Sequence, residues 1–413
     1  MKKKLIILFD EYPFEPGEYS FIQTELEMLV EHFEVSIISL SPSAEQKMTT
    51  DERISVYHCV RKFGIRKKVE AVFKFLTSRQ GCREIGRILR SGQSRIGRLY
   101  DSIVYFSSAE QLRSYARKNR LIQGEELVYS YWFNANCLAF LMDKEEYPNM
   151  KVVSRIHGYD LYNERNPHNR QPFREYMDEE IDTLFFVADA GLQYYMERWG
   201  KIENSGNKYK VARIGTTCDN FQKDQTAPKE KEQFCIVSCS DVIPLKRVDL
   251  IIEGLAQITD REILWIHFGA GSHYDKMKKY AEELLSRKGN ISYEMRGFVP
   301  FEEIKRLYAE HHVDCFLTTS STEGCPVSIQ EAMSYGIPII ATAVGEIPNM
   351  IAGNGILLSD NPSPEEIQKA VACLYSASDE DRLRMRERSR ALWEMKYDAV
   401  ENAEKFIEFL QFQ

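Results

Sequence analysis

Short apolar runs alternate with segments whose apolar residues recur every three or four positions along most of the chain. The run "KKLIILF" near the N-terminus predicts a β-strand, and the apolar spacing within 21–33 predicts an amphipathic helix after it. The run 34–40, "EVSIISL", predicts the next strand. The first forty residues therefore predict one βαβ unit, the building block of a parallel sheet.

The same alternation continues in two blocks. Further strands are expected at 126–133, 151–158, 182–188 and 209–215, and after the polar segment 219–232 at 234–240, 263–271, 291–299, 313–320 and 337–344. The second set alternates with predicted helices at 245–258, 275–289, 301–311 and 327–336. Strands this rich in apolar residues suit parallel sheets that helices cover on both faces.

These blocks predict an α/β protein with two Rossmann-like domains facing a cleft. The 413 residues are also too many for one ordinary core. We expect an N-terminal domain at 1–220 and a C-terminal domain at 221–392. The helical tail, at about 393–413, is expected to cross back to the N-terminal domain.

Charge and composition narrow the class of protein. A net charge of −8 argues against a general nucleic-acid binder. The basic start "MKKKLIILF" is followed at once by acidic residues and prolines, so it predicts a first strand and not a signal peptide. No apolar run approaches 18 residues, and the nine scattered cysteines suit reduced thiols in a cytoplasmic protein.

One segment departs from the acidic balance. Residues 61–98 hold twelve Lys and Arg against two Glu, a net charge of +10 in a chain whose total is −8. Within it, one face of a predicted helix carries Val69, Val72, Phe73 and Leu76. Two interpretations stay open: a surface helix that contacts anionic lipid, or an amphipathic helix that packs on the core with its basic side in water.

The stretch "STEGCPVSIQEAMSYG" is the main candidate site. It starts at the carboxyl end of a predicted strand, where open α/β sheets bind ligands. Pro326 suits the start of a helix that runs from Val327 to about Tyr335 and ends at Gly336. The first N–H groups of that helix favour an anion such as a diphosphate.

Two carboxylates flank this helix start. Glu331, on the second turn, can accept two hydrogen bonds from a ribose diol, and Glu323, just before the helix, can reach a sugar beyond the phosphates. The alternative is that Glu331 is a solvated helix residue and that Glu323 is only a cap.

Three segments together resemble one family. "SDVIPLKRVDLIIEGL", "RGFVPFEEIKRLYAEHHVDCFLTTS" and "EGCPVSIQEAMSYGIPIIATAVGEIPNMI" resemble, in order and spacing, the retaining GT-B glycosyltransferases of family 4, the glycosyltransferases group 1. Glu323 and Glu331 match that family's E-x7-E signature. The resemblance covers most of the C-terminal half and is looser in the N-terminal half.

The resemblance implies a donor site in the C-terminal half. Lys246 would bind the donor diphosphate, Glu323 the transferred sugar and Glu331 the ribose. The family often has an arginine five residues before the lysine; here that position is Asp241, and Arg247 is the candidate replacement. The other implied donor-binding residues are Gly297 and Phe298 near the nucleobase, and Gly324, Cys325, Pro326, Val327 and Ser328 around the sugar and phosphate.

In the N-terminal half, "YPFEPGEYSFIQTELEML" resembles the family's first loop, with Gly17 as the matching donor-binding glycine. "KVVSRIHGYDLY" resembles the segment whose histidine faces the sugar, here His157. Arg155 and Asp160 are further candidates beside it. The implied catalytic residues are therefore Glu323, His157 and Lys246.

No cofactor or metal is expected. "HFGAGSHY" holds Tyr274 where a dinucleotide fingerprint needs its third glycine, and no metal-ligand spacing or DxD pattern is present. Lys246 and the helix N-terminus would neutralise the leaving diphosphate in place of a metal.

The resemblance implies a retaining glycosyltransferase, of the hexosyltransferase type. It would transfer a sugar from a nucleotide sugar to a glycan or lipid-linked glycan in bacterial cell-surface polysaccharide biosynthesis. The expected location is the cytoplasm, with segment 61–98 on the inner face of the membrane. Two alternatives remain: a GT-B-fold nucleotide-sugar epimerase, and a non-catalytic membrane-associated scaffold. A glycan phosphorylase would need a pyridoxal lysine and a longer chain.

Overall fold

The computed structural model describes residues 2–15, 17–60, 65–91, 94–200, 208–218 and 233–413. The chain divides into two compact units: Met1–Ile214 with Ala403–Gln413 is unit 1, and Gly215–Asn402 is unit 2. The borders thus fall at 214/215 and 402/403, where the sequence suggested 220/221 and 392/393. The expected linker 219–232 lies outside the described residues.

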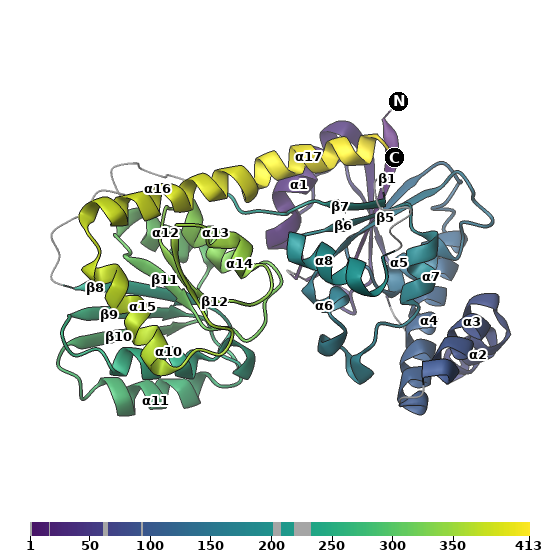
Figure 1. Cartoon of the computed structure of the whole chain (residues 1–413). Coiled ribbons are helices and arrows are strands. Elements are labelled where there is room, and N and C mark those ends of the chain that lie inside the picture. Colours follow the sequence, from purple (N-terminus) through teal and green to yellow (C-terminus); the bar gives the residue numbers. More distant parts are fainter. Residues whose placement is uncertain (1, 16, 61–64, 92–93, 201–207, 219–232) are drawn as a thin grey trace. The chain divides into compact units, whose positions relative to one another are not determined.

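Unit 1 is built on a seven-stranded parallel sheet of order β3-β2-β1-β4-β5-β6-β7 (Figure 1). Its strands are β1 Lys3–Phe9, β2 Phe33–Ser39, β3 Ser55–His58, β4 Leu127–Ser130, β5 Lys151–Ile156, β6 Thr183–Phe186 and β7 Tyr209–Val211. Its helices are α1 Tyr19–His32, α2 Ile65–Thr77, α3 Arg79–Ser91, α4 Arg95–Lys118, α5 Ala135–Leu141, α6 Gly158–Leu161, α7 Arg174–Glu180 and α8 Asp189–Arg198, with short 3-10 turns at Asn163–Arg165 and Pro167–Asn169.

Both faces of this sheet are covered, as the apolar strands predict. Alternate residues of β1 enter opposite cores: Ile6 and Leu8 join one, and Leu5, Ile7 and Phe9 join the other. Helices α4, α5 and α8 supply the first core, and α1 supplies the second. The strand pattern of a doubly covered parallel sheet is therefore confirmed.

The C-terminal helix α17, Ala399–Gln411, ends in unit 1. Its Phe406 ring packs edge-on against Tyr129 of β4 and Phe185 of β6, with both pairs of ring centroids 5.1 Å apart. Leu410 joins the same core. This confirms that the tail returns to the N-terminal sheet.

Unit 2 holds a six-stranded parallel sheet of order β10-β9-β8-β11-β12-β13. Its strands are β8 Phe234–Cys239, β9 Ile263–Phe268, β10 Ile291–Gly297, β11 Cys315–Thr318, β12 Ile339–Thr342 and β13 Gly355–Leu358. Its helices are α10 Val248–Ala256, α11 Tyr274–Leu285, α12 Phe301–Glu310, α13 Val327–Ser334, α14 Ile347–Met350, α15 Pro364–Ser376 and α16 Asp379–Lys396, with the 3-10 turn η5 Pro244–Lys246.

The strand order of unit 2 reverses between β8 and β11. From β8 the chain proceeds outward through β9 to β10, and β11 then starts the other half on the opposite side of β8. Ligands of open α/β sheets bind outside the carboxyl ends of strands at such a switch point. The loops that follow β8 and β11 carry Lys246 and Glu323, so the topology places the candidate site there.

Candidate functional site

Lys246 and Glu323 meet at the switch point of unit 2. Lys246 ends the η5 turn that follows β8, and Glu323 lies in the loop that follows β11. The Lys246 Nζ atom is 2.5 Å from the Glu323 Oε1 atom, and both side chains are largely buried. A cation and a carboxylate that are 77 residues apart in the chain therefore form one ion pair at the expected edge of the sheet.

Backbone contacts hold these two loops together. The Ser321 N–H donates to the Leu245 carbonyl at 2.8 Å, and the Thr319 hydroxyl donates to the carbonyls of Lys246 and Arg247 at 3.2 and 2.8 Å. These bonds fix the backbone on both sides of the ion pair, so the pair depends on loop geometry as well as on its own attraction.

Gly345 supports the Glu323 loop, and the sequence did not single it out. Its φ is +56°, and a Cβ atom there would lie 1.9 Å from the Glu323 carbonyl oxygen. The next N–H, of Glu346, donates to the Gly324 carbonyl at 3.0 Å. Only a glycine allows this close approach, and a glycine in the loop after a strand was the signal available in the sequence.

Helix α13 begins where the sequence predicted. Pro326 precedes it with φ −66°, the helix runs from Val327 to Ser334, and Gly336 follows with φ +65°. Its first turn contains no acidic residue. The first N–H groups of a helix have no partner inside the helix, so the backbone at Val327 and Ser328 offers donors to an anion.

Glu331 lies on the second turn of α13. Burial raises the pKa of its carboxyl to about 8, and the positive charge of Lys305 on α12 acts in the opposite direction. The carboxyl is therefore mostly protonated at neutral pH in the ligand-free site. Glu331 is partly buried on α13, and the loss of water is the main cause of its raised pKa.

Arg247 is placed differently from the expectation. Its guanidinium donates to the carbonyls of Thr319 at 2.6 Å, Ser320 at 3.0 Å and Asp360 at 2.8 Å, and to the side-chain oxygen of Asn361 at 2.9 Å. These bonds join the end of β11 to the segment after β13. Arg247 therefore ties backbone segments together, and its contact with the diphosphate stays a prediction.

The two residues expected near the nucleobase, Gly297 and Phe298, follow an edge strand of the sheet, two strands away from β8. Gly297 ends β10 with φ +68°, and the Phe298 side chain beside it is 85% exposed. The carboxyl end of β10 is two strands away from that of β8. The structure thus places both residues at the carboxyl edge of the sheet in unit 2, and their role near a nucleobase stays a prediction.

In unit 1, His157 follows β5 and lies in an aromatic setting. Its ring centroid is 4.8 Å from that of Tyr131 and 4.5 Å from that of Trp132. Among the described residues, neither ring nitrogen has a hydrogen-bond partner. Burial, followed by the nearby positive charge of Arg155, lowers the pKa of His157 well below its usual value. The imidazole is therefore neutral and suited to a hydrogen bond with an uncharged hydroxyl.

Asp160 positions that histidine. Its carboxylate accepts the His157 backbone N–H at 2.6 Å and the Phe133 N–H at 2.7 Å. Burial raises the pKa of Asp160 to about 7, while those two N–H groups lower it. Asp160 therefore joins the end of β5 to the loop after β4.

Arg155 is fully buried and makes structural contacts. Its Nη1 atom lies 2.8 Å from Glu25 Oε2, and its guanidinium lies 4.0 Å from the centre of the Phe406 ring. These contacts join β5 to α1 and α17. The structure therefore corrects the expectation that Arg155 contacts a ligand.

Glu18 organises the first loop and was missed in the sequence. Its carboxylate accepts the N–H groups of Asp10 at 2.9 Å and Tyr12 at 2.9 Å, and the Trp132 indole N–H at 3.0 Å. Gly17, the predicted glycine, is exposed in the same loop. No local pattern identifies Glu18, because its partners are backbone groups of a loop and a tryptophan 114 residues away.

No group of three or more His, Cys, Asp or Glu in the described part of the chain could hold a metal ion. None of the described helices combines the length and the apolar character that a membrane span requires. Metal independence itself stays a prediction.

The sequence relatives of the chain are glycosyltransferases. Residues 219–392 match the family described as "Glycosyl transferases group 1". Over 251 residues the chain is 24% identical to WcaL of Escherichia coli K12, a glycosyltransferase named for colanic acid biosynthesis. The aligned region is 56% of this chain and 57% of WcaL. Over 97 residues it is 36% identical to the lipopolysaccharide 1,6-galactosyltransferase of Salmonella typhimurium. That aligned region is 24% of this chain and 26% of the galactosyltransferase. The chain spans 57% or less of each of these two relatives.

Solved structures share the whole fold. The Anabaena protein Alr3699/HepE, in complex with UDP and glucose, superposes with a TM-score of 0.65 at 14% identity and full coverage of both chains. The lipopolysaccharide outer core galactosyltransferase WaaB superposes with a TM-score of 0.66 at 16% identity, covering 99% of each chain. Residues 219–392 are thus similar to the glycosyl transferases group 1 family, in a chain whose two Rossmann-like units have the GT-B fold.

Proposed function

We propose that this protein is a glycosyltransferase that moves a sugar from a nucleotide-diphosphate sugar to a hydroxyl of a glycan or lipid-linked glycan. The observation that carries the proposal is the Lys246–Glu323 ion pair at the switch point of unit 2, beside the first N–H groups of α13. Colanic acid and lipopolysaccharide, named in the relatives, support an acceptor of the cell-surface polysaccharide class.

The ion pair indicates how the donor would enter. Without a ligand, Glu323 neutralises Lys246 at 2.5 Å. A diphosphate carries more charge than one carboxylate, so it competes for Lys246, and Glu323 is then released to accept hydrogen bonds from sugar hydroxyls. Binding the donor would thus change the partner of both side chains in one step.

The same groups would stabilise the leaving diphosphate. Negative charge grows on the diphosphate as the bond to the anomeric carbon breaks, and a fixed cation with preoriented N–H groups stabilises that charge. Lys246 and the amides at Val327 and Ser328 supply both. We infer that no metal ion is needed for this step.

Glu331 would complete the donor contacts within unit 2, and His157 offers a separate polar group in unit 1. Glu331 would accept two hydrogen bonds from the ribose hydroxyls, which requires its ionised form. His157, at the carboxyl edge of the sheet in unit 1, has two buried ring nitrogens that would exchange a hydrogen bond with a sugar hydroxyl. The E-x7-E spacing of Glu323 and Glu331 supports retention of the anomeric configuration and membership of family 4.

Donor turnover tests this proposal. The purified protein is incubated with UDP-, GDP- and ADP-sugars and a glycan acceptor, and the nucleotide and glycan products are measured. We expect Lys246→Ala and Glu323→Ala to lower the rate about 100-fold or more, as the loss of a charge-stabilising group does. Lys279→Ala, an exposed lysine on α11, is the matched control and should keep the wild-type rate.

Two outcomes would favour the alternatives. A changed sugar nucleotide with no acceptor product would indicate an epimerase. The absence of turnover, together with no nucleotide that alters thermal stability, would indicate a scaffold. Wild-type rates in Lys246→Ala would show that the proposed site is wrong.

A further inference from the structure

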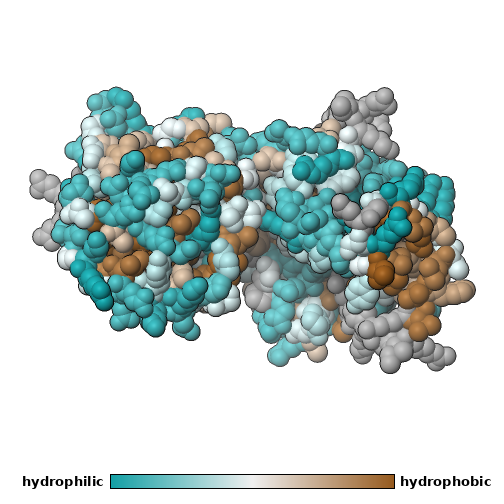
Figure 2. Space-filling model, turned by 60° about the horizontal axis from the view of Figure 1, so that its bottom comes forward, coloured by the Kyte–Doolittle hydropathy of each residue, from teal (hydrophilic) through white to brown (hydrophobic). Residues whose placement is uncertain are grey.

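An apolar patch covers the helical part of unit 1 that contains α2, α3 and the start of α4. Its members range from 51% exposed for Leu76 to 87% for Ile96. Figure 2 shows apolar side chains gathered on this part of the surface, at the right of the view. The apolar patch consists of Val69, Phe73 and Leu76 on α2, Leu89 on α3, and Ile96 and Tyr100 on α4.

The patch is not the core-facing side of α2. That side carries Ala71 and Phe75, both buried, and the Phe75 ring packs against Phe106 with centroids 5.6 Å apart. Val69 and Phe73 lie on the other side of the helix, one turn apart. The interpretation of a purely core-facing amphipathic helix therefore fails for the exposed residues.

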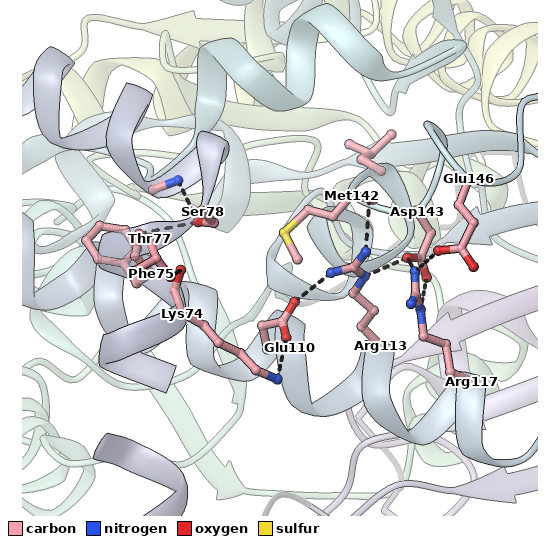
Figure 3. A network of polar contacts seen from close by, with 12 residues as sticks. Lys74, Phe75, Thr77, Ser78, Glu110, Arg113, Arg117, Met142, Asp143 and Glu146 are labelled. Atoms are coloured by element: carbon pink, nitrogen blue, oxygen red, sulfur yellow. Dashed lines mark hydrogen bonds and ion pairs between the residues drawn. The ribbon is translucent and has the colours of Figure 1, made fainter. Parts of the chain in front are cut away.

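A polar network fixes this orientation (Figure 3). Lys74 Nζ on α2 lies 3.2 Å from Glu110 Oε2 on α4, and Arg113 bonds Glu110 at 2.9 Å and Asp143 at 2.5 Å. Arg117 reaches the same Asp143, whose side chain is fully buried. The Lys74–Glu110 pair ties α2 to α4, and Arg113 and Arg117 tie α4 to the residue segment after α5, so a roll of α2 that turned its apolar face inward would break the Lys74–Glu110 contact.

Unpaired positive charge borders the apolar patch. Arg79, Arg83 and Arg87 of α3 have acidic partners in unit 1. In contrast, no acidic side chain of the described residues lies within ion-pair distance of Arg90 or Arg95, which adjoin Leu89 and Ile96 in the chain. The segment 61–98 also carries a net charge of +10. Apolar side chains bordered by free cations match an anionic bilayer surface.

The same charge argues against a second copy of this chain as the occupant. Two identical patches bordered by Arg90 and Arg95 would bring like charges face to face, while an anionic lipid surface attracts these arginines. We propose that the apolar patch docks on an anionic lipid bilayer, with its apolar side chains at the boundary of headgroups and acyl chains, and with Arg90 and Arg95 against lipid phosphates.

Vesicle co-sedimentation tests the docking surface with the full chain. We expect binding to vesicles of phosphatidylcholine with roughly one third phosphatidylglycerol, weaker binding to phosphatidylcholine alone, and release at high salt. The double variant Phe73→Ser/Ile96→Ser should lose more than tenfold in partitioning. Phe412→Ser is the matched control, because Phe412 is 86% exposed but lies outside the apolar patch, and it should bind as the wild type does.

A charge variant tests the electrostatic part of the docking proposal, the contact of Arg90 and Arg95 with lipid phosphates. Arg90→Glu/Arg95→Glu should lower partitioning at least 25-fold, since each lost cation near an anionic surface costs about fivefold. Lys279→Glu is its control in unit 2. The thermal midpoint and donor turnover in solution should not change in either patch variant, so a failure of docking stays distinct from a failure of the transferase proposal.

Three results would overturn the docking proposal. These are equal binding of the wild type to both vesicle compositions, unchanged partitioning of the Phe73→Ser/Ile96→Ser variant, and a wild-type dimer in sedimentation velocity that the same variant abolishes. The last would assign the patch to a second copy of the chain.

Discussion

At the scale of single residues, the candidate site depends on groups whose charge state is set by burial. Lys246 and Glu323 lie 2.5 Å apart, whereas burial raises the pKa of Glu331 to about 8, so its carboxyl is mostly protonated at neutral pH. His157 is neutral because burial lowers its pKa. Burial therefore favours the neutral forms of Glu331 in unit 2 and of His157 in unit 1.

The pKa of Glu331 predicts a pH dependence of donor binding. Two hydrogen bonds from ribose require the carboxylate, so below pH 8 a proton must leave when the donor binds. Affinity for the cognate nucleotide sugar should rise by up to tenfold per pH unit from pH 6 to 8 and then level off. Titration calorimetry in buffers of different ionisation enthalpy measures both the affinity and the released proton.

Glu331→Gln is the control for this prediction, because it cannot ionise. Its affinity should be nearly flat over the same range, and it should release no proton. An identical pH slope in wild type and variant would assign the titration to another group.

At the scale of elements, local signals predicted helix α13 well, and long-range contacts were not predictable. Pro326 and Gly336 mark the helix ends within a dozen residues, and the structure confirms them. The 2.5 Å contact between Lys246 and Glu323 required the adjacency of β8 and β11, which no local pattern contains. Only the resemblance to a family placed these two residues in one site.

The residues that were missed or misplaced share one property. Arg247 and Gly345 contact backbone groups of another loop, and Glu18 joins backbone N–H groups of its own loop to the distant Trp132, so the partners of all three depend on tertiary structure. An exposed apolar face on α2 was visible as a periodic pattern, but its direction was decided by Phe75 and the Lys74–Glu110 contact. Sequence periodicity identifies a face, and packing decides which way it points.

The loop that holds Glu323 gives a second prediction at this scale. Gly345→Ala should lower the free energy of unfolding of unit 2 by about 1–3 kcal/mol and reduce donor turnover, because its Cβ would displace the Glu323 carbonyl. Urea denaturation and turnover measure the two effects.

Gly353→Ala is the matched control. Gly353 also has a positive φ, +84°, but a Cβ there would meet only Arg388 Cγ at 3.9 Å. This variant should carry the backbone strain and keep its turnover. Equal losses of turnover in the two variants would contradict the role given to the Glu323 loop.

At the scale of the whole molecule, each unit is a parallel sheet with its own pair of cores, and the C-terminal helix belongs to the first unit. The alternating apolar pattern predicted both sheets, and the return of the tail was expected as part of the GT-B fold. Phe406 joins β4, β6 and Arg155, so the end of the chain stabilises the sheet in which its first strand lies.

Removal of the Phe406 ring should destabilise unit 1. Phe406→Ala is expected to lower its free energy of unfolding by about 3–5 kcal/mol, because a fully buried aromatic side chain is replaced by a cavity. Fluorescence-monitored urea unfolding checks this, with Phe412→Ala as a control expected to change stability by less than about 0.5 kcal/mol. Coincident unfolding curves for the Phe406 variant and the wild type would contradict the packing described for α17.

Nucleotide recognition by unit 2 is tested most directly by the thermal midpoint of the wild type and of Lys246→Ala with UDP, GDP, ADP and their sugars. We predict that nucleotides of one base raise the wild-type midpoint by about 5 °C or more at 100 times their Kd, and that Lys246→Ala shows little or no shift at the same concentration. A wild type that no nucleotide stabilises, or a Lys246→Ala variant stabilised as much as the wild type, would contradict a diphosphate site at Lys246.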